Sequence, residues 1–185
     1  MKKAGKPRRK ICLLMTATLA LLIAGLGFYA GWKQGERAEH SEKTGLSLRH
    51  ARLISETDTH GGFHGDGLAL FVYGLEDDSM LEEIKNSPEW KSLPFGKMEE
   101  VFLYGVHAVE EDGMERQDGP YFVFNNQREP IVPRIENGFV KVIDRHSEGN
   151  GQTDCETIFE RASINLTVMI YDTDEKLLYI CDMDT

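Results

Sequence analysis

The sequence lacks the short motifs that mark the common enzyme and metal-site families. It contains no C-x-x-C pair, no glycine-rich nucleotide-binding loop, no H-E-x-x-H helix and no G-x-S-x-G turn. Only three of its 185 residues are cysteines. No catalytic signature remains, so the sequence favours a non-enzymatic protein over an enzyme and indicates no catalytic residue.

Acidic residues are missing from the N-terminal part of the chain. No Asp or Glu occurs before Glu36, whereas residues 1–10 carry six Lys and Arg. The other 15 Lys and Arg and all 31 Asp and Glu follow Trp32, which gives residues 33–185 a net charge of −16. Such a domain is repelled by nucleic acid, so we expect no nucleic-acid partner. Cations and basic proteins suit it better, although excess acid also serves solubility alone.

Charged residues are also absent from residues 11–32, an unbroken apolar run. As a helix this run is about 33 Å long, enough to cross a hydrocarbon core of about 30 Å. Tyr29 and Trp32 lie at its outer end, where aromatic rings prefer the membrane interface. The basic residues 1–10 should stay in the cytoplasm. We therefore expect a single-pass signal-anchor in the cell membrane, with the C-terminal domain extracytoplasmic.

A cleavable signal peptide is the alternative to this anchor. Cleavage requires small residues at positions −3 and −1. A cut after Ala30 places Phe28 at −3, which fits poorly, while Gly25 and Gly27 lie inside the apolar run. Cys12 stands at the start of the run and not at its end, which argues against a lipoprotein cleavage site. We favour the uncleaved anchor.

Small residues recur along the apolar run at a spacing of four. Gly27 and Gly31 form a G-x-x-x-G, and Ala20 and Ala24 repeat the spacing. Such spacing lets two membrane helices approach closely, although glycine and alanine are common in any membrane helix. The face that carries Gly27 and Gly31 is a candidate homodimer contact.

Residues 33–45 are polar and form a predicted stalk, and residues 46–185 contain no internal repeat, so we treat them as one domain. Apolar, aromatic and β-branched runs predict its strands. The strongest are 68–75, paired with 52–57, and 164–171, which forms a hairpin with 176–182. Weaker runs predict strands at 101–107, 121–125 and 139–144.

Two short helices interrupt these strands. The first runs over 79–86, with Asp77 or Asp78 as its cap and Met80, Leu81 and Ile84 as its apolar stripe. The second begins at the capping box 153–156, and its apolar face consists of Cys155, Ile158, Phe159 and Ala162. Strands punctuated by two helices predict an α+β domain around a mainly antiparallel sheet.

The segment from Asp58 to Gly67 is rich in glycine, histidine and aspartate. His60, His64 and Asp66 are candidate ligands for a divalent metal, since imidazoles and carboxylates on a flexible loop suit such ions. The two histidines lack the helical context of a strong zinc motif. We therefore favour a glycine-rich strand connection whose polar groups satisfy its own backbone, and we predict no cofactor other than this alternative metal.

A second polar cluster covers residues 144–148, Asp-Arg-His-Ser-Glu. A base, a hydroxyl and a carboxylate are present, but neighbours on a strand point to opposite faces. We therefore interpret these residues as a polar strand end with an ion pair between Asp144 and Arg145.

Cys155 and Cys181 both lie beyond the membrane segment, where a disulfide can form. Cys155 also lies on the apolar face of the second helix, where a free cysteine is a common small apolar residue. The pairing of Cys155 with Cys181 is thus one alternative, and two free thiols are the other.

Several segments together resemble a family of uncharacterised, small, membrane-anchored bacterial proteins. They are residues 58–67, 89–94, 144–148, 171–174 and 182–185. The resemblance implies an anchored extracytoplasmic domain and transfers no catalytic residue.

Three functions follow as hypotheses. The first is a binding or interaction domain without catalysis, held at the outer face of the membrane. The second is a metal-dependent enzyme or metal sensor that uses the loop 58–67 and also His146. The third is an accessory subunit of a membrane complex.

Overall fold

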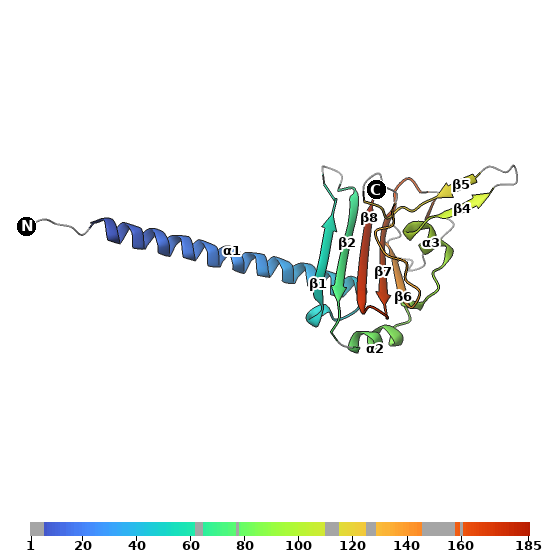
Figure 1. The fold of residues 1–185 in the computed structure, drawn as a ribbon, viewed down its shortest axis with the longest axis horizontal. Helices are drawn as coiled ribbons and strands as arrows, with labels where there is room; N and C mark the ends of the chain where they lie inside the picture. Colours follow the sequence, from blue (N-terminus) through green and yellow to red (C-terminus); the bar gives the residue numbers. More distant parts are fainter. Residues whose placement is uncertain are drawn as a thin grey trace, which may run out of the picture. The chain divides into compact units, whose positions relative to one another are not determined.

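The structure is a computed structural model that describes residues 6–61, 65–76, 78–109, 115–124, 129–145, 158–159 and 161–185. The chain divides into two compact units, Met1–Arg49 and His50–Thr185. Helices and strands carry the labels of Figure 1.

The N-terminal unit is dominated by one long helix, α1 (Lys6–Thr44). From Met15 onward it contains a stretch long and apolar enough to cross a membrane. The helix predicted over 11–32 is confirmed, and it continues without interruption through most of the predicted stalk 33–45. It ends where Gly45 adopts a positive φ of 72° and its N–H donates to the Ser41 carbonyl. A short 3-10 turn, η1 (Leu48–His50), follows.

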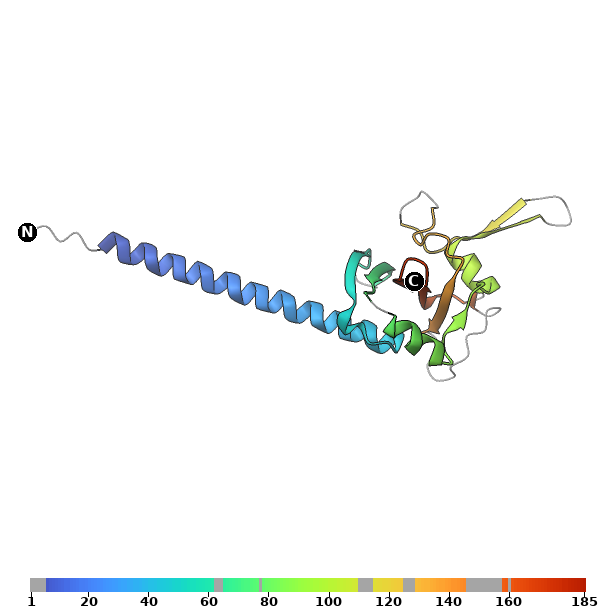
Figure 2. The ribbon, with the colours of Figure 1, turned by 60° about the horizontal axis from the view of Figure 1, so that its bottom comes forward.

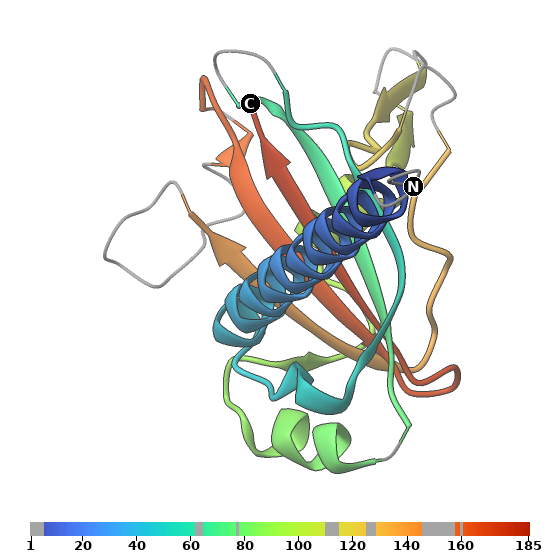
Figure 3. The same cartoon turned by 90° about the vertical axis from the view of Figure 1, so that its left-hand side faces the viewer.

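The C-terminal unit is built on a six-stranded antiparallel sheet (Figures 1 and 3). Its spatial order is β1-β2-β8-β7-β6-β3, so β8 lies between β2 and β7. The predicted pairing of 52–57 with 68–75 and the predicted C-terminal hairpin are both confirmed. The strands are β1 (Arg52–Asp58), β2 (Gly67–Gly74), β3 (Lys91–Ser92), β6 (Gly138–Asp144), β7 (Asn165–Asp172) and β8 (Leu177–Asp184). The α+β class with a mainly antiparallel sheet is therefore correct.

The central strands β7 and β8 are buried on both faces. On β7, Leu166, Val168 and Ile170 join the main core cluster, as their alternation predicts. The intervening Thr167, Met169 and Tyr171 are at most 1% exposed as well. This double burial explains why the two strands are apolar along nearly their whole length.

The helix α2 (Ser79–Asn86) has the bounds that the sequence predicts. Met80 and Ile84 are buried, which confirms two of the three stripe positions, and Leu81 is half-buried. Asp78 occupies the N-cap position, but its side chain makes no capping hydrogen bond. Packing of the apolar stripe therefore contributes more to this helix than capping does.

The strand predicted at 101–107 is wrong, because its first half belongs to a helix, α3 (Lys97–Leu103). Met98, Val101 and Phe102 follow helical spacing and are all buried. The helix ends at Gly105, whose φ is 73° and whose N–H donates to the Glu100 carbonyl. A separate hairpin follows, β4 (Val106–Val109) and β5 (Glu115–Asp118), which extends away from the main sheet (Figure 2).

The strand predicted at 121–125 is also wrong over its described part, 121–124. The N–H groups of Tyr121 and Phe122 both donate to the Phe102 carbonyl at the end of α3. These two N–H groups thereby bond to a carbonyl at the C-terminal end of α3 and not to a neighbouring strand. Phe122 is fully buried, so the aromatic run reflects core packing and not a strand.

The main core lies between the sheet and α3, where side chains of β2, β6, β7 and β8 form one cluster with Met98, Phe102 and Leu103. The capping box of the second predicted helix, including Cys155, lies outside the described residues. Of its predicted apolar face, Ile158 is fully buried, whereas Phe159 is 37% exposed and stacks on Phe102 with ring centroids 5.1 Å apart.

Candidate functional site

A polar cluster lies where β1, β6 and β8 end. This end of the sheet also holds the C-terminus (Figure 1). We call it the His60 cluster, and it consists of Asp58, His60, Arg145, Asp182 and Asp184. Its members come from both ends of the domain sequence. Antiparallel pairing of β1, β2 and β8 brings them together, since Asp58 lies opposite Ala69 and Ala69 opposite Asp182.

His60 is held between two carboxylates. Its ring nitrogen Nδ1 lies 2.6 Å from Asp58 Oδ1, and Nε2 lies 3.1 Å from Asp184 Oδ2. The backbone N–H of His60 also donates to Asp58 Oδ1, at 2.8 Å. Both ring nitrogens therefore face an acceptor, and the imidazole links the end of β1 to the end of β8.

The chain after His60 returns so closely that only glycine fits at the start of β2. A Cβ added to Gly67 would lie 2.5 Å from the Cα atom of His60. Thr59 also links the end of β1 to the start of β2. Its hydroxyl donates to the Leu68 carbonyl and accepts a hydrogen bond from the Leu68 N–H. These contacts support the interpretation of this segment as a glycine-rich connection with internal hydrogen bonds.

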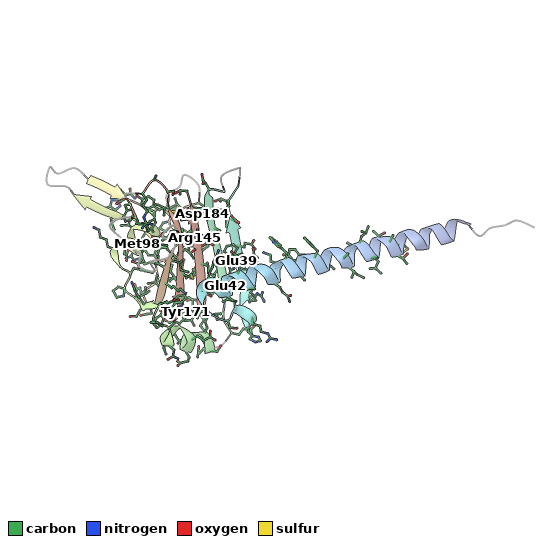
Figure 4. All side chains as sticks on the ribbon, turned by 180° about the vertical axis from the view of Figure 1, so that it is seen from behind. Glu39, Glu42, Met98, Arg145, Tyr171 and Asp184 are labelled. Atoms are coloured by element: carbon green, nitrogen blue, oxygen red, sulfur yellow. The ribbon has the colours of Figure 1, made fainter. Side chains whose placement is uncertain are left out.

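Arg145, which directly follows β6, binds the end of β8. Its Nη2 donates to Asp184 Oδ1 and to the Met183 carbonyl, both at 2.9 Å, and its Nη1 lies 3.5 Å from Asp182 Oδ1. Asp182 is 5% exposed and also accepts the hydroxyl proton of Thr167. Figure 4 labels Arg145 and Asp184 at this end of the sheet.

The Arg145 guanidinium is not fully satisfied by its neighbours. Its Nε is buried and has no hydrogen-bond partner among the described residues. The cluster joins the three carboxylates to one guanidinium and one imidazole. Paired charges of this kind are destabilising to break, because each partner would be left without its counter-charge.

The structure describes two of the three predicted metal ligands, His60 and Asp66. His60 belongs to the cluster and contacts carboxylates through both nitrogens. Asp66 is exposed in the connection, and His64 lies outside the described residues. Within the ranges that the structure describes, no three His, Cys, Asp or Glu side chains are arranged to hold a metal ion. Metal binding by His60, His64 and Asp66 stays a prediction.

The ion pair predicted between Asp144 and Arg145 is not the one that forms. Asp144 accepts a hydrogen bond from Arg161 Nη1 at 2.6 Å, while Arg145 turns to Asp184. Successive strand residues point to opposite faces, so adjacent charges find separate partners. His146, Ser147 and Glu148 lie outside the described residues.

Sequence reasoning missed Thr167, Asp182 and Asp184. The alternation of Asp182 and Asp184 in an otherwise apolar strand was the available signal, since carboxylates on a buried face require partners. The predicted strand ends at Asp182 and so does not include Asp184.

Cys181 is a free thiol on the core face of β8. It is fully buried, and this burial raises the pKa of the thiol far above its usual range. Cys155 lies outside the described residues, so its pairing with Cys181 stays a prediction.

We expect Cys181 to resist alkylation in the folded protein. Only a thiolate reacts readily with iodoacetamide. Burial raises the pKa of the Cys181 thiol, which keeps it neutral, and also shields the sulfur from the reagent. Peptide-resolved mass spectrometry after iodoacetamide treatment should find Cys181 unmodified under native conditions and modified in urea. Rapid native modification at Cys181 would contradict the buried position of β8.

Gly27 and Gly31 both lie on α1. Among the described residues, a Cβ added at either glycine would meet nothing within 4 Å. Helix association through the face that carries Gly27 and Gly31 stays a prediction.

Comparison of the chain with family models, with characterised proteins and with solved structures found no match.

Proposed function

We propose that this protein is a membrane-anchored, extracytoplasmic binding domain without catalysis. The observation that carries the proposal is the long apolar stretch of α1, preceded by the six basic residues within 1–10 and followed by an acidic α+β domain. The basic flank favours a cytoplasmic N-terminus, and the acidic domain then faces outward.

The His60 cluster supports a role in binding more than a role in a reaction. Both nitrogens of its imidazole contact carboxylates, and the neighbouring Thr167 hydroxyl donates to Asp182, which is itself buried. In a catalytic site, by contrast, the nucleophile and its base must lie within hydrogen-bond reach of each other, and the nucleophile must be accessible to the substrate. The described contacts join three strand ends, so the cluster would hold a binding surface rigid.

A topology experiment tests the anchor. A reporter that is active only outside the cytoplasm, fused after Thr185, should be active, and the product should fractionate with membranes at full length. A matched fusion should replace Lys2, Lys3 and Lys6 by glutamate, which weakens the positive flank and should lower the fraction of outward-facing reporter. A cytoplasmic C-terminus, or a mature chain shortened through the apolar run, would contradict the proposal.

A further inference from the structure

A cavity lies at the end of the six-stranded sheet that is away from the C-terminus (Figure 1). There β1 begins, β2 ends and β8 begins, since Arg52 pairs with Gly74 and Gly74 with Leu177. The cavity is lined by Arg52 and Ile54 of β1 and by residues 74–76 and 175–177. Its volume of about 350 Å³ falls within the range of small-molecule sites.

Gly74 leaves room for this cavity in the middle of the row formed by Arg52, Gly74 and Leu177. A Cβ added to Gly74 would lie 2.8 Å from Ile54 Cδ1. The Ile54 side chain, which is 47% exposed, therefore reaches across to β2 and lines the cavity together with Leu177. An apolar group of a ligand would gain free energy by covering these two side chains.

Charged side chains of both signs line the rest of the cavity. Arg52, Glu76 and Glu175 are exposed, and their side chains form no hydrogen bond or ion pair within the described part of the chain. Lys176 differs from them, because its Nζ lies 2.8 Å from Asp78 Oδ1. One guanidinium and two carboxylates are therefore the charged groups that remain to bind a ligand.

The turn that closes one side of the cavity is held in a strained conformation. Lys176 has a φ of 54°, which glycine adopts at the least cost. Its carbonyl accepts a hydrogen bond from the Leu75 N–H at 3.1 Å, and its side chain binds Asp78. Strain of this kind occurs preferentially at functional sites, where the surrounding contacts fix the backbone.

The mixture of charges selects the ligand. A simple anion at Arg52 would lie near two carboxylates, and a simple cation at the carboxylates would lie near the guanidinium. Each would meet repulsion as well as attraction, whereas a molecule that carries both charges is attracted by both groups. The volume restricts this molecule to a small one, since it is near the lower end of the range for ligand sites.

We propose that this cavity binds a small zwitterion with an apolar side chain, a free amino acid or a dipeptide. The Arg52 guanidinium presents paired donors that match a carboxylate. Glu76 and Glu175 supply acceptors for the ammonium group. Ile54 and Leu177 contact the apolar side chain. The inference rests on the proposed binding function and names the class of ligand.

The test uses the full chain in detergent micelles, with leucine and leucyl-leucine as probes. Isothermal titration calorimetry should detect binding, and the tighter of the two probes assigns the cavity to free amino acids or to peptides. The tighter probe is then compared with its N-acetylated form, which lacks the ammonium charge, and with its C-terminal amide, which lacks the carboxylate. Each blocked form should bind about tenfold more weakly, because it loses a hydrogen bond between charged groups.

Variants of the chain locate the two contacts. Arg52→Gln should weaken binding of the probe about tenfold but leave binding of the amide unchanged, because the amide has no carboxylate for Arg52. The double variant Glu76→Gln, Glu175→Gln should weaken binding of the probe and leave the N-acetylated form unaffected. Arg49→Gln is the control, since Arg49 is exposed and lies outside the cavity, and it should change neither. The melting temperature of each variant verifies folding.

Equal binding of the probe and its blocked forms, or equal effects of Arg52→Gln and Arg49→Gln, would overturn the inference. Absence of binding by both probes, with the reporter at Thr185 still active outside the cytoplasm, would also overturn it and leave the proposed anchor intact.

Discussion

Replacing Phe102 by alanine should lower the free energy of unfolding by about 3–5 kcal/mol. Phe102 is fully buried, and its ring lies against those of Phe122, Tyr121 and Phe159 at centroid distances of 6.1, 5.2 and 5.1 Å. The substitution therefore leaves a cavity between α3 and the sheet and removes three ring contacts. Such a loss is a large share of the stability of a domain this size.

Phe159 is the matched control for Phe102. It belongs to the same stack but is 37% exposed, so Phe159→Ala removes less buried area. We expect it to cost about 1 kcal/mol, mainly the ring contacts. Urea unfolding of the full chain in detergent, followed by tryptophan fluorescence, gives both values. Equal losses from the two substitutions would show that Phe159 is buried as deeply as Phe102.

Replacing Arg145 by methionine should cost about 3 kcal/mol of unfolding free energy, near the lower end for breaking a buried ion pair. Methionine keeps most of the side-chain length but leaves Asp182 and Asp184 without their guanidinium. The Arg145 side chain is 26% exposed, so water compensates part of the loss. Circular dichroism melting of the purified chain checks the expected fall in melting temperature.

Arg134 provides the control for the charge change. Its Nη2 lies 2.9 Å from Glu100 Oε1, but its side chain is 63% exposed, so Arg134→Met should cost less than about 1 kcal/mol. The two substitutions alter net charge equally. If they destabilised the protein to the same extent, the His60 cluster would contribute nothing beyond an ordinary surface pair.

The elements that the sequence predicts well are those whose pattern is local. Residues 79–86 combine a helical apolar stripe with Pro88 just beyond the end, and the hairpin 164–182 combines alternation with the polar turn 172–175. Each carries its own stop signal. Their bounds in the structure agree with those signals within two residues.

The elements that escaped prediction depend on partners far away in the chain. The run Val101-Phe102-Leu103 has strand-like residues, but burial against the sheet selects a helix for it. The amide groups at Tyr121 and Phe122 bond to the end of that helix, which no local pattern reveals.

The sequence singles out His60 as one of three candidate metal ligands in an unusual loop, and it places Arg145 at a polar strand end, paired with Asp144. Their actual partner, Asp184, lies 124 residues from His60, so only the sheet register brings them together. Sequence spacing offers no equivalent information about such a contact.

The central place of β8 has a consequence for how the chain folds. The hairpin β1–β2 is made early in synthesis, yet its neighbour in the sheet is β8, made at the end of the described chain. Until β8 arrives, the inner edge of β2 has no strand to bond, and contacts of such long sequence separation form slowly. The domain therefore passes through a period in which β2 is open to wrong partners, and chaperones would act during that interval.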